Sequence, residues 1–495
     1  MASIFRLVFL LVLIYGDRID RVTSDSLTTS EKSTSDSTEL PKPVEKVCDK
    51  CRCTVEIVDC SNMGLTSNLH DHEWPKASRE VNFNDNNITW VRQFPKVLIN
   101  RLSFRNNAIE KIDNQAFRPL AGNFTELDLS HNLLSFENFK PIVLDGRYAD
   151  EAYEPLGNLR MLNLSGNKFH SLDKDLFEHV QDLHVLDLSD NPFSIFDHAA
   201  TMSLTDLPYL SELYLSRCKL KKLDATTLHV LSHLKKLDLT GNEFSVLPDA
   251  LQDTNSLETL ILDQNSIEYL GPNNSFPIMF GLKYLSLSSM PKLSIIDKGA
   301  LSNLQALETL VVENCPLLTE IHEDALIQKR KGMGPTWPSM KKLHLVNNSL
   351  RYLPFTLIAR WDLLEELHVT NNKWSCDCIN QHFIGTLLPN LGSRLMSLNE
   401  SLQLVCSGPV EMKNINFTTL AGRELRCLDA YGSRPDRDAT IMIGALVGVL
   451  LAIPLVLGFL LLWSRGYFFC GEQGPASYSR AFYKRARPFD DDCYI

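Results

Sequence analysis

The stretch LRMLNLSGNKF, residues 159–169, carries leucine at its first, fourth and sixth positions and asparagine at its ninth. Alternate residues of a strand point to the same face, so Leu162 and Leu164 are expected to face inward and Asn163 to face the other way. The amide of Asn167 can donate and accept hydrogen bonds with backbone groups that a tight turn would leave unpaired. The stretch therefore predicts a short strand followed by a turn that Asn167 stabilises.

The same pattern of leucines and asparagine recurs along most of the chain. Clear copies read FTELDLSHNLL (124–134), LHVLDLSDNPF (183–193), LKKLDLTGNEF (234–244), LETLILDQNSI (257–267) and MKKLHLVNNSL (340–350). With LSELYLSRCKL (210–220) and several weaker copies they amount to about twelve repeats. No single unit can bury its own leucines, so neighbouring units must stack and place their strands side by side in a parallel sheet.

Asparagine fills the ninth position of most repeats. The series is Asn86, Asn107, Asn132, Asn167, Asn191, Asn242, Asn265, Asn348 and Asn372. Cys218 and Cys315 occupy the same register, and so does Met290, where the turn is expected to be weaker or altered. Four repeats separate the two cysteines, roughly 20 Å along stacked strands, which is too far for a disulfide. Both cysteines are therefore expected to be buried, reduced thiols.

On these repeats, residues 48–427 resemble the extracellular leucine-rich repeat family. The resemblance implies an α/β solenoid, with a curved parallel β-sheet on its concave face and irregular or short helical segments on its convex side. It places about twelve repeats in residues 77–373. In this family cysteine also occurs at the turn position, and disulfide-bonded caps cover the leucine core at both ends.

Two groups of cysteines flank the repeats. Residues 47–76 contain CDKCRCTVEIVDC, and residues 374–428 contain CDC and two further cysteines. The sequence alone leaves three ways to join four cysteines within each group. The resemblance implies the pairs Cys48–Cys53, Cys51–Cys60, Cys376–Cys406 and Cys378–Cys427, with Trp374 over the last turn of the core. A zinc site in CDKCRC is the weaker interpretation, because a secreted chain favours disulfides.

Apolar stretches near both ends indicate passage through the secretory pathway. Residues 1–16 have a basic residue, a short apolar run and then a small residue, which predicts a signal peptide. Residues 440–463 contain no charge and would be roughly 36 Å long as a helix, against about 30 Å for the hydrocarbon core of a bilayer. They predict one transmembrane helix.

The charges beside this span predict its orientation. Asp436 and Asp438 precede it, whereas Arg465, Arg480, Lys484, Arg485 and Arg487 follow it. Basic residues accumulate on the cytoplasmic side, so the sequence predicts a single-pass type I protein of the plasma membrane with its N-terminus outside the cell. Residues 17–46 then form a disordered Ser/Thr-rich segment, residues 429–439 a juxtamembrane linker and residues 464–495 a short cytoplasmic tail.

The span and the tail hold several candidate contact and modification sites. Gly444 and Gly448 form a G-x-x-x-G pair that could bring two spans together as a homodimer, although small residues also recur by chance. Cys470 could be palmitoylated. Four tyrosines of the tail could recruit a cytoplasmic adaptor after phosphorylation.

The outer surface offers candidates for glycosylation and for binding. Sequons begin at Asn87, Asn123, Asn163, Asn273, Asn347, Asn399 and Asn416. Glycan on Asn163 would cover part of the concave face. On that face Glu212, Tyr214, Asp263, His344 and His368 are candidates for binding a protein, since tyrosine is favoured at contact hot spots. The alternative is that they are ordinary solvated strand residues. Insertions at residues 136–157 and 328–338 are either plain surface loops or partner-binding loops.

Neither catalysis nor a cofactor is indicated. HDHE, residues 70–73, lacks the spacing that places two histidines on one helical face, and no nucleophile elbow, phosphate loop or dinucleotide fingerprint is present in a suitable context. The net charge of −11 argues against general nucleic-acid binding. We expect a non-enzymatic surface glycoprotein that binds an extracellular or cell-surface protein in adhesion or recognition. The alternative is a co-receptor that captures a secreted ligand for a signalling partner.

Overall fold

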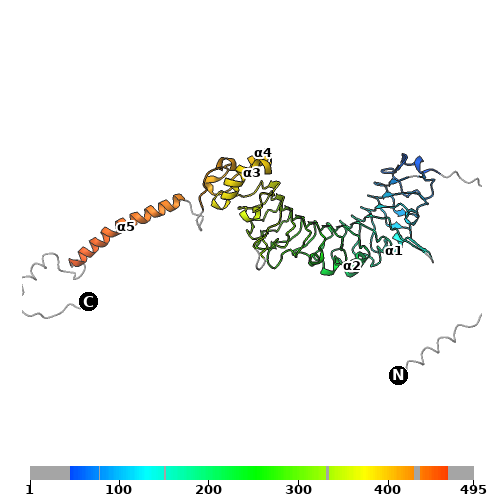
Figure 1. The fold of residues 1–495 in the computed structure, drawn as a ribbon, viewed down its shortest axis with the longest axis horizontal. Helices are drawn as coiled ribbons and strands as arrows, with labels where there is room; N and C mark the ends of the chain where they lie inside the picture. The colour runs from blue at the N-terminus through cyan, green and yellow to red at the C-terminus, as the bar shows by residue number, and fades with distance from the viewer. Residues whose placement is uncertain (1–44, 77, 150–151, 330–333, 428–434, 466–495) are drawn as a thin grey trace, which may run out of the picture. The chain divides into compact units, whose positions relative to one another are not determined.

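A computed structural model describes residues 45–76, 78–149, 152–329, 334–427 and 435–465 (Figure 1). The predicted signal peptide, nearly all of the Ser/Thr-rich segment, Cys470 and the rest of the tail lie outside these residues.

The repeats build one sheet of fourteen strands, which lines the inner side of the solenoid in Figure 1. In spatial order the strands are β1 (Arg52–Cys53), β2 (Ile57–Asp59), β3 (Glu80–Asn82), β5 (Arg101–Ser103), β7 (Glu126–Asp128), β10 (Met161–Asn163), β11 (Val185–Asp187), β12 (Glu212–Tyr214), β13 (Lys236–Asp238), β14 (Thr259–Ile261), β16 (Tyr284–Ser286), β18 (Thr309–Val311), β20 (Lys342–His344) and β21 (Glu366–His368). Only β1 pairs antiparallel, with β2; every later pair in this sheet is parallel.

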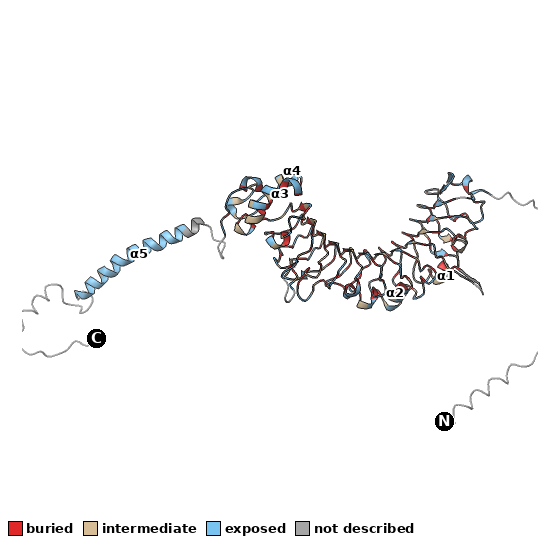
Figure 2. Cartoon of the chain, in the orientation of Figure 1, coloured by how far each residue is buried: buried red, intermediate tan, exposed pale blue. Residues whose placement is uncertain are grey.

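The register of the strands follows the leucines. Leu162 pairs with Leu127 on one side and Leu186 on the other, and all three are fully buried or nearly so. The residues before and after each central leucine point to the concave surface, as alternation along a strand requires. This arrangement confirms the predicted parallel sheet, and its burial is drawn in Figure 2.

The convex side is built from short segments. Small parallel ribbons join β4 (Trp90–Val91) to β6 (Lys111–Ile112), and β15 (Tyr269–Leu270) to β17 (Ile295–Ile296) and β19 (Glu320–Ile321). The α-helices of the repeats are α1 (Pro141–Leu144) and α2 (His198–Ser203). Short 3-10 helices are η2 (Arg118–Leu120), η3 (Leu204–Asp206), η4 (Ala225–Thr227), η5 (Asp249–Asp253) and η6 (Phe355–Ile358). Irregular and short helical segments therefore close each turn; the ribbons were not predicted.

Asparagines connect successive turns. Asn167 Nδ2 donates to the carbonyl oxygens of Leu129 and Leu164 at 3.0 and 2.9 Å, and its Oδ1 accepts from the backbone of Leu134 at 3.0 Å. Gly166, directly before it, has φ +65°, and a Cβ there would lie 2.4 Å from His131 Nδ1. Each asparagine thus satisfies buried backbone groups of two neighbouring turns, as the repeat pattern predicts.

Cysteine and methionine substitute in this turn without changing its backbone. The residues before Cys218, Met290 and Cys315 have φ between 53° and 57°, like those before the asparagines. All three side chains are fully buried, and burial raises the pKa of Cys218 to about 12 and that of Cys315 to about 11. The two cysteines are unbridged. The expectation of an altered turn at Met290 is wrong for the backbone, since packing of the neighbouring turns fixes it.

Disulfide-bonded caps close both ends of the core. In the first cap Cys48 bonds Cys53 and Cys51 bonds Cys60, and η1 (Val47–Asp49) lies beside them. In the second cap Cys376 bonds Cys406 and Cys378 bonds Cys427. Its helices are α3 (Leu388–Leu395), α4 (Leu398–Gln403), the π-helix η8 (Phe383–Leu387), and the 3-10 helices η7 (Cys378–Asn380), η9 (Val410–Met412) and η10 (Phe417–Leu420).

A tryptophan seals the core under each cap. Trp374 is 1% exposed, its Nε1 donates to Val369 O at 3.0 Å, and its ring meets Phe383 edge to face. Trp74 repeats the arrangement at the other end, where Nε1 donates to Leu69 O at 3.0 Å. Each indole covers one end of the apolar core with its rings, while its Nε1 stays hydrogen-bonded to a backbone carbonyl.

The C-terminal helix α5 (Pro435–Ser464) contains one candidate membrane span, Ala439–Ser464. Its side chains are exposed along nearly the whole described span (Figure 2), which is the distribution that a lipid-facing helix requires. The predicted residues 440–463 lie within this helix.

Candidate protein-binding face

The concave sheet presents two parallel rows of side chains. The outer row holds the residue before each central leucine, and the inner row holds the residue after it. From β12 to β21 the outer row reads Glu212, Lys236, Thr259, Tyr284, Thr309, Lys342 and Glu366. The inner row reads Tyr214, Asp238, Ile261, Ser286, Val311, His344 and His368. Strand register therefore determines which polar groups become neighbours.

A charged cluster forms where the rows cross β12 and β13. Tyr214 donates its hydroxyl proton to Glu212 Oε2 at 2.5 Å, and Lys236 Nζ donates to the Tyr214 hydroxyl oxygen at 2.8 Å. Burial, followed by the bond to Glu212, raises the pKa of Tyr214. The bond to Tyr214 raises the pKa of Lys236. Two candidate residues, Glu212 and Tyr214, thus form one preorganised unit together with Lys236.

The next three strands carry no charge on either row. The rows on β14, β16 and β18 hold Thr259, Ile261, Tyr284, Ser286, Thr309 and Val311, of which Ser286 is buried. Tyr284 is half-buried, and burial raises its pKa. The centres of protein interfaces are depleted of charge and enriched in tyrosine, and their rims are polar. This uncharged patch, defined by the six residues above, has the composition of such a centre.

Asp263 supports the fold rather than presenting a free carboxylate to the concave surface. Its Oδ1 accepts from Ser286 Oγ and from the backbone of Ser288, both at 2.7 Å. Burial raises the pKa of this carboxyl. Both hydrogen bonds reach the next repeat, so the carboxyl ties β14 to the turn after β16.

A histidine cluster lies beyond the uncharged patch. His344 on β20 pairs with His368 on β21, and their rings meet edge to face with centroids 4.5 Å apart. Around them, His368 Nδ1 lies 2.5 Å from Glu400 Oε1, and His344 Nε2 lies 3.5 Å from Glu366 Oε2. Burial, followed by His368, lowers the pKa of His344. Lys342 lowers the pKa of Glu366 through a direct hydrogen bond.

The five predicted binding residues lie in two separate clusters on the concave face, with Asp263 between them in a structural role. Five strand steps separate Tyr214 from His344, roughly 24 Å at about 4.8 Å per step. Sequence reasoning missed Lys236, Tyr284 and Glu400. The outer row could have shown the first two, because each precedes an inward leucine. Glu400 comes from α4 in the cap, where no repeat predicts its neighbours.

The predicted sequons differ in exposure. Asn87, Asn123, Asn273, Asn347 and Asn399 are exposed, whereas Asn163 and Asn416 are half-buried. Asn163 lies on the inner row of β10, and its Oδ1 accepts from Ser165 N and Ser165 Oγ at 2.9 and 2.7 Å. Asn416 Nδ2 donates to Leu402 O at 2.7 Å. Occupancy of all seven sequons stays a prediction.

The first insertion folds into short elements. It contains α1 and an antiparallel hairpin of β8 (Arg147–Ala149) and β9 (Ala152–Glu154). The backbone of Gly146 donates to His179 Nδ1 at 2.8 Å, which anchors the insertion to the following repeat.

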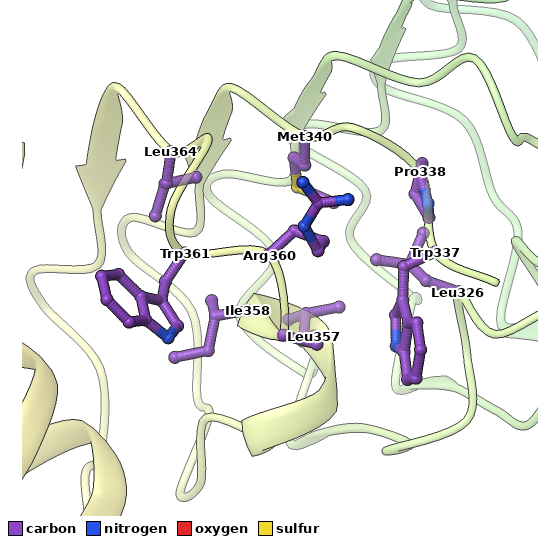
Figure 3. A pocket seen from close by; sticks show the side chains of 10 residues that line it. Leu326, Trp337, Pro338, Met340, Leu357, Ile358, Arg360, Trp361 and Leu364 are labelled. Atoms are coloured by element: carbon purple, nitrogen blue, oxygen red, sulfur yellow. The ribbon is translucent and has the colours of Figure 1, made fainter. Parts of the chain in front are cut away.

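The second insertion lies over a narrow crevice. Figure 3 shows Trp337 and Pro338 of this insertion on one side and Trp361 on the other, with Leu357 and Ile358 between them. The crevice has a volume of about 10 Å³, which is room for about one water molecule. It is too small for an organic ligand.

A wider apolar hollow of about 370 Å³ lies in the C-terminal cap. Leu388 and Met396 line it from α3 and its end, Leu398 from α4, and Phe417 from η10. The cap sequence gave no indication of this hollow, because its lining residues follow no repeat.

Comparison with known proteins agrees with the repeats. A family model described as leucine rich repeat matches residues 157–211 and 208–267. Lumican of Mus musculus is 33% identical over 195 residues, which are 38% of this chain and 50% of lumican. The chain thus spans about half the length of that relative.

Two further relatives match other shares of the chain. Trophoblast glycoprotein of Mus musculus is 24% identical over 66% of this chain and 68% of its own. Transforming growth factor beta activator LRRC32 of Pongo abelii is 29% identical over 51% of this chain and 44% of its own.

Among solved structures, a chain of the octameric complex of Latrophilin 3, Unc5D and FLRT2 is 20% identical, with a TM-score of 0.44, over 77% of this chain and 98% of that one. The matched repeats, the extracellular relatives and the cysteine caps lead to one assignment. The chain contains leucine-rich repeats between disulfide-bonded caps, and it is similar to extracellular leucine-rich repeat proteins.

Proposed function

We propose that this chain is a single-pass type I glycoprotein of the plasma membrane that binds another extracellular or cell-surface protein through its concave face. Its role is cell adhesion or cell recognition. The observation that carries the proposal is the uncharged patch around Tyr284, bordered by the Tyr214 cluster on one side and the histidine cluster on the other. A centre without charges and with a tyrosine, surrounded by a charged rim, is the composition of a protein interface.

The concave face combines preorganised polar groups at the border of the uncharged patch with a rigid support. Tyr214 is already held between Glu212 and Lys236, so little side-chain entropy remains to be lost when a partner binds. The strands beneath are fixed by fully buried leucines and by the asparagines of the turns. A partner would therefore dock on a surface that needs little rearrangement.

The exposed sequons and the apolar helix α5 support the proposed location at the plasma membrane. Five of the seven sequons are exposed on the solenoid and its second cap. The acidic residues before the span and the basic residues after it favour an extracellular solenoid. Gly444 and Gly448 lie one turn apart on α5, and nothing else lies within 4 Å of a Cβ built on either. A second copy of the span can approach there, and a homodimer stays a proposal.

A co-receptor is the second candidate function. One relative is named as an activator of transforming growth factor beta, which favours capture of a secreted ligand. In this role a partner receptor would carry the signal into the cell. We further propose that residues 464–495 bind a cytoplasmic adaptor and that Cys470 is palmitoylated.

Cell mixing separates the two functions. Cells that display the full chain would be mixed with labelled cells that lack it, and soluble extracellular proteins would be added in parallel. Adhesion predicts binding between the two cell populations that is lost in Tyr284→Arg and kept in the control Tyr209→Arg, an exposed tyrosine outside the strands of the concave sheet. Capture of a soluble protein without any binding between cells would exclude adhesion and favour the co-receptor.

A further inference from the structure

The histidine cluster places three metal-binding side chains together. One ligand atom each from His344, Glu366 and His368 can be chosen so that all three atoms lie within 4.8 Å of one another. β20 and β21 fix this arrangement, because His344 and His368 are register partners and Glu366 lies two residues before His368 on the same strand. The three side chains thus project from the same face of two adjacent strands.

The donor set suits a borderline transition metal. Two imidazoles and one carboxylate are the protein ligands of many zinc sites, which leave a fourth position open. Calcium and magnesium prefer oxygen ligands alone, so the two imidazoles disfavour both ions. Ligand atoms around tetrahedral zinc lie roughly 3.3 Å apart, given bonds of about 2.0–2.1 Å. Small side-chain rotations would bring the three ligand atoms, which lie within 4.8 Å of one another, to this zinc-bound spacing.

A second layer of side chains orients the three donors. His368 Nδ1 lies 2.5 Å from Glu400 Oε1, so Nε2 is the nitrogen left to bind a metal. Lys342 Nζ donates to Glu366 Oε1 at 2.6 Å and leaves Oε2 toward His344. His344 Nδ1 lies 3.6 Å from Glu313 Oε1. Carboxylates behind the imidazoles are the usual outer partners of zinc-binding histidines.

Charge and exposure also favour a cation here. Glu313 lies beside His344, Glu400 lies beside His368, and only Glu366 is paired with an ammonium group, that of Lys342. The described surroundings of the two rings therefore carry an excess of negative charge. His344 Nε2 is itself inaccessible to solvent and makes no hydrogen bond. The side chains of His344 and His368 are 23% and 29% exposed, so the cluster borders the concave surface, and a small rotation of the His344 ring would expose its Nε2 to an entering metal ion.

We propose that His344, Glu366 and His368 bind one Zn²⁺ ion on the concave face, with Glu400 positioning His368 and the fourth coordination position open to water or to a donor group of a docked protein. This metal site does not depend on the proposed protein-binding function, because Zn²⁺ binding can be measured without any protein partner.

The test is titration of Zn²⁺ into the purified full chain in nanodiscs, followed by calorimetry and by competition with a fluorescent chelator. We expect the wild type to bind one more ion than His344→Gln, His368→Gln or Glu366→Gln. The control His229→Gln removes an exposed histidine that also lies beside a carboxylate, 3.4 Å from Asp253, and should leave that ion bound. Zn²⁺ binding identical in the wild type and in all three ligand variants would overturn the proposal.

Glu400→Gln tests the positioning role separately. Loss of an outer partner typically weakens a metal site about 10- to 100-fold, so the affinity of this site should fall within that range. Substitution of Co²⁺ for Zn²⁺ provides a spectroscopic signature, since the visible absorption of a four-coordinate ion should appear in the wild type and His229→Gln and be absent from His368→Gln. Circular dichroism of each variant checks folding. If the double variant that carries both His344→Gln and His368→Gln folds and still shows the four-coordinate Co²⁺ spectrum, the assigned ligands are wrong.

Discussion

The thiol of Cys218 donates to the carbonyl oxygen of Leu188 at 3.3 Å, in the turn where other repeats use an asparagine amide. The thiol takes the place of the amide NH₂ as a hydrogen-bond donor, but it supplies no counterpart to the amide oxygen, which accepts. An asparagine at position 218 would accept a hydrogen bond from the backbone N–H of Phe193 with its side-chain oxygen. With cysteine there, this N–H donates instead to Asn191 O at 2.9 Å. A local bond thus compensates for the missing oxygen.

Cys218→Ala should therefore destabilise the solenoid modestly, because it removes the thiol bond while Leu188 O keeps its bond from Asn191 Nδ2 at 2.9 Å. The expected loss is about 0.5–1.5 kcal/mol in the free energy of unfolding, measured by denaturant titration. Cys218→Asn restores a donor and an acceptor and should cost less than Cys218→Ala. A Cys218→Ala variant as stable as the wild type would show that the thiol bond contributes nothing.

Both turn cysteines should resist alkylation in the folded protein. Their side chains are fully buried, and the raised pKa values, about 12 for Cys218 and about 11 for Cys315, keep them protonated at neutral pH. Iodoacetamide treatment before and after denaturation, read by mass spectrometry, should label both only after denaturation. Rapid labelling of either one in the native protein would contradict its burial.

Trp374→Ala should open the end of the core beneath the second cap. It removes a fully buried indole and its bond to Val369 O, at an expected cost of about 3–5 kcal/mol. Surface expression of the full chain should fall, and the thermal transition of the purified protein should move down. Trp361→Ala is the matched control, because Trp361 is 40% exposed and its loss should change the transition little. Equal effects of the two substitutions would argue against Trp374 as the seal of the core.

Asp206 introduces a pH dependence of stability. Burial, followed by Asp175 and Glu178, raises its pKa from 3.8 to about 6. The folded state then disfavours the carboxylate, so this group destabilises the fold at pH 7 and the penalty disappears as pH falls through about 6 toward 4. Asp206→Asn should raise the melting temperature at pH 7 and have a smaller effect near pH 4.5. The same increase at both pH values would show that charge is not the cause.

The periodic parts of this fold were predictable and the aperiodic parts were not. Leu162 and Asn167 indicate strand and turn because each repeats at a fixed position, and stacking then follows from the need to bury the leucines. Strand register also explains why His344 and His368 are neighbours. The contact between His368 and Glu400 joins the last repeat to a cap helix, so it depends on how the cap folds back. The local bond of Phe193 likewise depends on a neighbouring substitution, Cys218, rather than on its own repeat.

Proximity labelling on living cells tests the central claim most directly, namely that the concave patch around Tyr284 binds a protein. Wild type, Tyr284→Arg and Tyr209→Arg would be displayed at equal surface levels as fusions to a labelling enzyme. The prediction is a set of labelled surface or secreted proteins that is shared by the wild type and Tyr209→Arg and is depleted for Tyr284→Arg. Identical labelling by all three proteins would contradict the assignment of the concave patch as the binding face.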